Sequence, residues 1–304
     1  MPRKLRFVPQ HGMLVEVTCR TLQARHLLQP SPEVNELILG VLGRAQRLYG
    51  MRICGFVFMS NHYHLLLDVN DAQQMARFMT FLNGNLAKEI GRKVDWREKV
   101  WARRYEAILV SPEAGLSRLS YLLSHGVKEG LVEHPREWPG AHCVDALLNG
   151  KPLRGLWFNR TLEYRARNRG DDFDPMEFAE VETVEVSPLP EWRGRSRAGF
   201  RRQLKAMIER IVGQRRVHRN PRRDRPAVQG FNLGPHHRPA RPNRSPAPAF
   251  HGLTLASKAL LRDAYCLFAS SYRTAAEKLQ AGFLDVTFPE SSFPPPLPFV
   301  ASRA

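Results

Sequence analysis

Two histidines separated by one residue are the first feature of this sequence that suggests chemistry, in the run Asn61-His62-Tyr63-His64-Leu65-Leu66-Leu67. The composition of this run favours an extended backbone, so residues 62–69 are expected to form a strand. Side chains alternate along a strand, which places His62 and His64 on one face and Tyr63 on the other, toward the core. Two imidazoles in this arrangement can bind one divalent metal ion, although a pair of strand histidines without a ligand fits this short pattern as well.

A tyrosine and a histidine one helical turn apart form the second feature. Ser111-Pro112-Glu113 has the residues of a helix N-terminus, and the helix is expected to run to about Lys128. Tyr121 lies about 140° from the centre of the apolar stripe, and His125 lies one turn later on the same face as Tyr121, near Lys128. The alternative is an ordinary surface tyrosine on an amphipathic helix. The apolar stripe itself comprises Leu116, Leu119, Leu123, Val127 and Leu131.

The elements that must position these residues follow the order β-α-β-β-α-β. Strands are expected at residues 13–19, 51–59, 62–69 and 105–110, from their β-branched and apolar runs. One helix is expected from the Ser31-Pro32 cap to Tyr49, and a second from the Asp71 cap to Gly91, before the helix that carries Tyr121. This order predicts an α+β fold of the ferredoxin-like, split βαβ type over residues 1–145.

Taken together, the two motifs resemble those of the single-tyrosine transposases that carry a histidine–hydrophobic–histidine (HUH) motif. Residues 59–67 are similar to the HUH motif, and residues 121–132 are similar to the helix with the nucleophilic tyrosine. Within that family the chain most resembles the REP-associated tyrosine transposases, in which a V-K-x-G-L-V stretch and a Trp-Pro pair, here Trp138-Pro139, follow the tyrosine. The resemblance covers roughly residues 5–143. It departs at Ser60, where that branch usually has proline, and at His125-Gly126, where it usually has Asn-Pro.

This resemblance implies an RRM-like form of the α+β fold, with Tyr121 as the nucleophile and His62 and His64 as metal ligands. His125 stands where relatives often place a third polar ligand. The implied cofactor is Mg²⁺ or Mn²⁺, and the implied reaction is cleavage and transfer of single-stranded DNA through a 5′-phosphotyrosine at hairpin or repeat elements. The phosphotyrosine stores the energy of the phosphodiester, and the absence of a G-x-x-x-x-G-K-[ST] loop agrees with a reaction that needs no ATP.

Two other classes of function fit the same elements. One is a catalytically silent DNA- or RNA-binding protein on the same sheet. The other is a metal hydrolase that acts through activated water and leaves Tyr121 unused. Only the transposase chemistry predicts a covalent adduct between protein and DNA.

Charge supports a nucleic-acid partner. Lys and Arg number 46 against 29 Asp and Glu, a net charge of +17, and residues 193–244 alone carry +14. Such a balance indicates that the protein binds a polyanion, here expected to be single-stranded or hairpin DNA. The alternative is a basic protein that has no such partner. The candidate DNA-contacting cations are Arg103, Arg104, Lys128, Arg201, Arg202, Arg215 and Arg216.

The rest of the chain is expected to form a C-terminal extension that is helical in part and rich in Arg and Pro. Residues 146–192 connect to a basic arm at 193–249, which includes a helix at 199–213, and residues 250–304 hold a long helix at 253–281 and a proline-rich tail. We expect the long helix to pack on the first unit. Four scattered cysteines fit a reducing cytoplasm, and the lack of a run of about 18 apolar residues predicts no membrane segment. We expect a nucleoid-associated protein, in keeping with the DNA partner, that is either a monomer or a homodimer.

Overall fold

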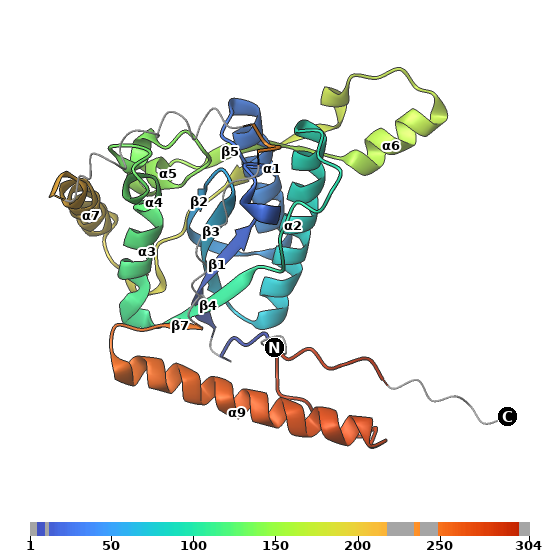
Figure 1. Ribbon diagram of the computed structural model, residues 1–304, viewed down its shortest axis with the longest axis vertical. Helices are drawn as coiled ribbons and strands as arrows, with labels where there is room; N and C mark the ends of the chain where they lie inside the picture. The colour runs from blue at the N-terminus through green and yellow to red at the C-terminus, as the bar shows by residue number, and fades with distance from the viewer. Residues whose placement is uncertain (1–4, 10–11, 218–233, 238–248, 298–304) are drawn as a thin grey trace.

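A computed structural model of the protein describes residues 5–9, 12–217, 234–237 and 249–297, without the side chains of 215–217. Its centre is a five-stranded sheet in the order β2-β3-β1-β4-β7 (Figure 1). Neighbouring strands are antiparallel, except that β7 runs parallel to β4. The predicted α+β class is confirmed. The strands of this sheet are β1 (Met13–Arg20), β2 (Arg52–Phe58), β3 (His62–Val69), β4 (Glu106–Val110) and β7 (Phe250–His251).

Two helices, α1 (Pro32–Tyr49) and α2 (Ala72–Lys93), lie side by side against one face of this sheet (Figure 1). Both begin at the predicted caps: the Ser31 hydroxyl accepts a hydrogen bond from the amide of Val34 at 3.2 Å, and the Asp71 carboxylate accepts one from the amide of Gln74 at 2.7 Å. Gly50 ends α1 in a left-handed conformation, with φ of +58°. The order β1-α1-β2-β3-α2-β4 is the predicted one.

The predicted end of α2 at Gly91 is wrong. The helix continues to Lys93, and the amide of Val94 still donates to the carbonyl of Ile90 at 3.0 Å. Gly91 keeps a helical backbone, since a glycine weakens a helix by only about 1 kcal/mol and does not by itself stop one.

The opposite face of the sheet is covered by α3 (Gly115–Leu123), which follows a 3₁₀ turn, η2 (Pro112–Ala114), and by the short α4 (His125–Lys128). The predicted single helix to Lys128 is therefore wrong, because it breaks at Ser124. In an unbroken helix the amide of residue 125 would bond the Tyr121 carbonyl. Here the Ser124 hydroxyl donates to that carbonyl at 2.8 Å, and Nδ1 of His125 lies 3.2 Å from it.

The apolar face of these two helices largely matches the predicted stripe. Leu119, Leu123 and Val127 are buried, and Leu116 and Leu131 pack on the core with part of their surface exposed. Leu122, which the stripe omitted, is also buried. The buried face of α3 and α4 is therefore wider than the predicted apolar stripe.

Residues 144–184 form elements that the sequence analysis largely missed. They are α5 (Val144–Asn149), β5 (Leu153–Phe158), α6 (Arg160–Arg169) and β6 (Ala179–Val184). β5 and β6 form a separate antiparallel pair that packs on α1. Glu182 in β6 forms ion pairs with Arg44 and Arg47 of α1, at 3.0 and 2.6 Å.

The contact between α1 and β5 depends on glycine at the crossing point, which gives a stability prediction. A Cβ atom on Gly40 would lie 1.9 Å from the carbonyl oxygen of Leu156, a backbone atom that cannot move aside. Gly40→Ala is therefore expected to lower the free energy of unfolding by about 3 kcal/mol or more in a urea titration. The control is Gly84→Ala on the exposed side of α2, where nothing lies within 4 Å and about 0.5–1 kcal/mol should be gained. Equal stability of the two variants would contradict this packing.

Two long helices follow. The predicted helix at 199–213 lies within α7 (Arg197–Val217), and its apolar side chains are all buried: Phe200, Leu204, Met207, Ile208 and Ile211. Arg215 and Arg216 lie in its last turn, and their side chains are outside the described residues, as is most of the predicted basic arm after Val217. None of the helices among the described residues is long and apolar enough to span a membrane.

For the last helix, α9 (Leu255–Gln280), the apolar spacing of Leu253, Ala256, Leu260, Leu267, Ala275 and Leu279 predicts the buried side only in part. Ala275 and Leu279 are buried, together with Leu261 and Ala269, whereas Leu260 and Leu267 are 72% and 70% exposed. The helix runs along the lower edge of the molecule beside β7 and packs through aromatic rings (Figure 1). The Phe7 ring lies 6.0 Å from that of Tyr265 and 5.0 Å from that of Phe268, so the helix contacts the first unit at its margin.

Candidate active site

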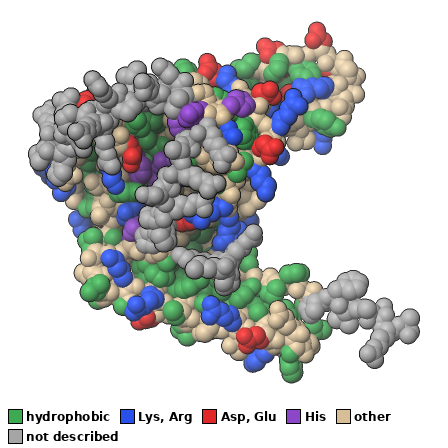
Figure 2. Space-filling model, in the orientation of Figure 1, with side chains coloured by type: hydrophobic (Ala, Val, Ile, Leu, Met, Phe, Trp, Pro, Cys, Tyr) green, Lys and Arg blue, Asp and Glu red, His purple; other side chains and the backbone are tan. Residues whose placement is uncertain are grey.

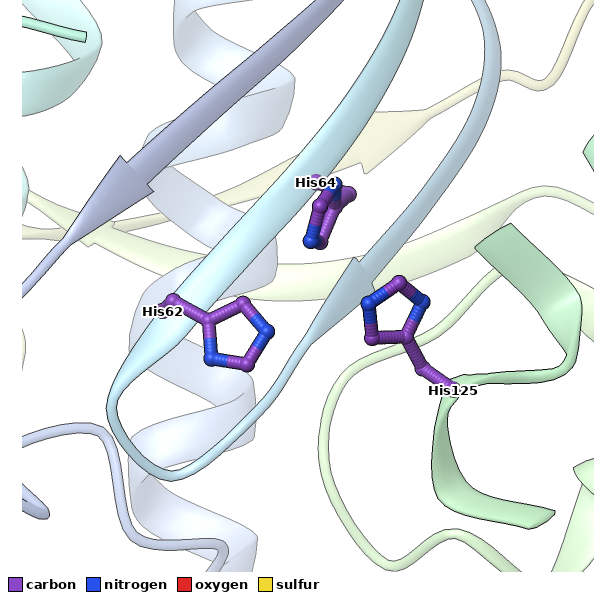
Figure 3. A group of neighbouring side chains, drawn as sticks. All are labelled: His62, His64 and His125. Carbon is purple, nitrogen blue, oxygen red and sulfur yellow. The ribbon is translucent and has the colours of Figure 1, made fainter. Parts of the chain in front are cut away.

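Three histidines converge on the sheet face that α3 and α4 cover. His62 and His64 project from the same side of β3, and His125 approaches from the start of α4 (Figure 3). One ring nitrogen of each lies within 4.8 Å of those of the other two. The rings of His64 and His125 are 4.2 Å apart. The structure thus brings together the three residues that the sequence analysis selected as metal ligands.

The hydrogen bonds of these histidines leave the same ring nitrogen of each one available. Every Nδ1 atom faces an oxygen that can only accept a hydrogen bond, so Nδ1 carries the proton and Nε2 keeps its lone pair. The Asn61 oxygen is the one that faces His62, because the amide nitrogen of Asn61 donates to the carbonyl of Ala24 at 3.2 Å. The three Nδ1 partners are Asn61 Oδ1 for His62 at 2.7 Å, Glu16 Oε1 for His64 at 2.9 Å and the Tyr121 carbonyl for His125 at 3.2 Å.

Burial keeps two of the imidazoles neutral at physiological pH. It lowers the pKa of His62 well below its ordinary value and the pKa of His125 to about 3, and in each case the neighbouring His64 acts in the same direction. A neutral imidazole is the form that binds metal. With metal–nitrogen bonds of about 2.1 Å, ligand atoms lie within about 4 Å of one another, so the cluster could bind an ion after a small contraction.

Tyr121 lies beside this cluster and among positive charges. Its ring centroid is 4.8 Å from that of His125 and 5.9 Å from that of His64. The Arg118 guanidinium lies over the ring at 4.0 Å, and Nζ of Lys128 lies 5.0 Å from the ring centroid. Burial and the charge of Glu16 raise the pKa of Tyr121, and Arg118 opposes that rise. The face predicted to carry Tyr121, His125 and Lys128 therefore lies toward the two histidines of β3.

Sequence reasoning missed Glu16, the buried carboxylate that connects these groups. It lies on β1 and is only 2% exposed. Oε1 accepts the hydrogen bond from His64, and Oε2 accepts one from Nε of Arg118 at 2.8 Å and lies 2.5 Å from Nη2 of the same side chain in an ion pair. Burial raises the pKa of Glu16, but hydrogen bonds from His251 and His64 and the charge of Arg118 outweigh this and hold it well below its ordinary value. Glu16 is therefore an anion that fixes both His64 and Arg118.

A signal for Glu16 and Arg118 was present in the sequence. Glu16 interrupts the apolar run Leu14-Val15-Glu16-Val17 on a strand, where a charge is rarely buried without a partner. Arg118 stands three residues before Tyr121, and so on the same side of the helix.

The other predicted DNA-contacting cations lie in different surroundings from Lys128. Arg103 forms an ion pair with Glu106 on β4, and Arg104 is exposed. Arg201 donates to the carbonyl of Asn149 at 2.8 Å, and Arg202 is exposed on α7. In the space-filling view, histidine side chains are visible on the upper and left parts of the molecule, and Lys and Arg side chains are spread over the same face (Figure 2).

The buried neutral histidines give a prediction for stability against pH. An unfolded histidine has a pKa near 6.5, and that of folded His125 is about 3, so between these values the unfolded chain binds more protons than the folded one. Stability without metal should therefore fall from pH 7 to pH 5, with about 2 kcal/mol due to His125. Urea titrations at both pH values should show a smaller loss for His125→Asn. The control His134→Asn, outside the cluster, should keep the full loss, and an unchanged loss in His125→Asn would contradict burial of the neutral ring.

Comparison with known proteins gives a family match for part of the chain. Residues 12–121 match the family of IS200-like transposases. The matched region begins before β1, contains His62 and His64, and ends at Tyr121. The resemblance drawn from the sequence is thus confirmed over residues 12–121, which include His62, His64 and Tyr121.

Two solved structures show a more distant likeness. A REP-associated tyrosine transposase bound to a REP hairpin is 15% identical, with a TM-score of 0.38 over 47% of this chain and 82% of that one. A Deinococcus radiodurans protein assigned as a transposase is 18% identical, with a TM-score of 0.30 over 40% of this chain and 95% of that one. Comparison with curated proteins gives no match.

Proposed function

We propose that this chain cuts and rejoins single-stranded DNA at hairpin or repeat elements, as in DNA transposition, with Tyr121 as the nucleophile. The observation that carries the proposal is the position of Tyr121, whose ring lies 4.8 Å from that of His125 and 4.0 Å from the Arg118 guanidinium. A surface tyrosine with no role in catalysis has no need of three convergent imidazoles and a buried carboxylate–arginine pair beside it.

The three histidines would hold the metal ion through their Nε2 atoms. When bound, a divalent metal supplies Lewis acidity that withdraws charge from the scissile phosphate and orients it. Imidazole donors favour Mn²⁺ over Mg²⁺, since Mg²⁺ prefers oxygen ligands and would depend more on waters and the phosphate. Glu16 keeps His64 in the required tautomer and orientation, as carboxylates commonly do for metal-binding histidines.

The tyrosine must lose its proton as it attacks, because its pKa is raised and the phenol is protonated at neutral pH. Arg118 and Lys128 place positive charge beside the ring, which favours the phenolate. The phenolate oxygen forms a bond to phosphorus, the bond from phosphorus to the 3′ oxygen breaks, and that oxygen leaves with a proton as a free 3′-OH. The 5′-phosphotyrosine that remains can be attacked by another 3′-OH, which rejoins the strand.

The test is incubation of the full chain with labelled hairpin and single-stranded oligonucleotides, with Mn²⁺ or with EDTA, followed by denaturing electrophoresis. We expect a labelled band of protein mass with Mn²⁺ that is absent with EDTA. Binding without cleavage would favour the silent DNA- or RNA-binding protein. Cleavage that leaves no covalent band would favour a hydrolase that uses water.

A further inference from the structure

The C-terminal extension reaches the candidate active site through β7. This strand adds to the free edge of β4: the amide of Leu109 donates to the carbonyl of Ala249 at 3.3 Å, and that of Ser111 donates to the carbonyl of His251 at 2.8 Å. The extension therefore pairs with the same sheet that carries Glu16 and His64.

The register of the sheet determines which face His251 occupies. Paired residues on neighbouring strands share a face, and His251 pairs with Val110, which pairs with Leu14. Glu16 lies two residues after Leu14 and therefore on the same face as Leu14, His251 and the metal-site histidines. Accordingly, Nε2 of His251 lies 3.4 Å from Oε2 of Glu16, and the His251 side chain is 20% exposed.

The two oxygens of Glu16 are divided between different partners. Oε1 accepts from His64, whereas Oε2 faces Arg118 from α3 and His251 from β7. The contacts at Oε2 fix the rotation of the carboxylate, and that rotation decides whether Oε1 points at His64. His251 approaches from the sheet edge and Arg118 from the covering helix, so the two hold the carboxylate from different elements.

We propose that His251 is a positioning residue of the active site, which the C-terminal extension supplies and which acts through Glu16 on His64 and Arg118. This inference rests on the proposed function for its catalytic consequence. It means that the cutting unit extends beyond both the matched residues 12–121 and the predicted unit 1–145, because one of its parts comes from residue 251.

The test compares full-length His251→Ala and His251→Gln, since glutamine keeps an N–H donor that can reach Oε2. We expect His251→Ala to lower kcat for cleavage about tenfold with KM unchanged, and to weaken Mn²⁺ binding in calorimetry by about three- to tenfold. His251→Gln should restore most of both. The control is His237→Ala, an exposed histidine of the same extension, which should match the wild type.

A double variant separates positioning from general support of the fold. In a Glu16→Gln background, His251→Ala should have little further effect, because the carboxylate that it orients is gone. Normal cleavage and Mn²⁺ affinity in His251→Ala, or equal losses in the alanine and glutamine variants, would overturn the proposal. If the wild type binds Mn²⁺ but forms no adduct, the proposed function fails, and the Mn²⁺ affinities alone still decide whether His251 positions the site.

Discussion

Tyr121→Phe is expected to abolish cleavage and covalent adduct formation, with a loss of at least about a thousandfold, while hairpin binding stays close to that of the wild type. The change removes the oxygen that would attack phosphorus and leaves the ring in place against His125 and Arg118. Stability should change by less than about 1 kcal/mol, because one partly exposed hydroxyl is lost. Cleavage is measured on a labelled hairpin oligonucleotide, and binding by fluorescence anisotropy.

Tyr164→Phe is the matched control, since Tyr164 on α6 is 62% exposed. It loses the same hydroxyl group and should keep full activity. Strong cleavage by the Tyr121→Phe protein would rule out a phosphotyrosine at this position. Loss of hairpin binding together with cleavage would assign Tyr121 to DNA recognition instead.

His64→Ala is expected to abolish both Mn²⁺ binding and cleavage, and excess Mn²⁺ should not rescue either. His64 is the most central of the three ligands, with its ring 5.2 Å from that of His62 and 4.2 Å from that of His125. Glu16→Gln should have an intermediate effect, with Mn²⁺ affinity about 10–100-fold weaker, because an amide oxygen can still accept from His64 but carries no charge. Calorimetry with Mn²⁺ and the cleavage assay provide the two measurements.

The control for this series is His134→Ala, a histidine that caps a 3₁₀ turn after α4. It should bind Mn²⁺ as the wild type does. Wild-type Mn²⁺ affinity in His64→Ala would show that the ion binds elsewhere. A Glu16→Gln protein with wild-type Mn²⁺ affinity, or with a lower affinity than His64→Ala, would contradict the supporting role assigned to Glu16.

Local signals made the central elements and the three candidate metal-binding histidines predictable. Ser31 and Asp71 mark the starts of two helices, because their side chains accept hydrogen bonds from amides three residues later. These bonds depend only on residues that are close in the sequence. His62 and His64 share a face because strands alternate, and His125 follows Tyr121 by one turn. Each of these relations spans four residues or fewer.

What could not be predicted depends on contacts between distant segments. Glu16 meets His64 because β1 pairs with β3 in a register set by the whole sheet, and Thr18 rather than Glu16 lies opposite His64. His251 reaches Glu16 only because a two-residue strand, too short for any periodicity, pairs with β4.

The misjudged helices show how tertiary contacts override local patterns. The break at Ser124 arises because two side chains compete for one carbonyl, although the apolar spacing continues through it. In α9, Leu260 and Leu267 face outward although their spacing predicts burial, and the helix packs instead through Leu261 and through the contacts of Tyr265 and Phe268 with Phe7.

The central claim is that Tyr121 forms a covalent bond to DNA beside a metal held by three histidines. The most direct measurement is mass spectrometry of the trapped adduct after digestion with nuclease and protease. The account predicts a single modified peptide that carries a 5′-linked nucleotide phosphate on Tyr121, formed only when Mn²⁺ or Mg²⁺ is present. A nucleotide on any other residue, or DNA cleaved with every Tyr121 peptide unmodified, would contradict it.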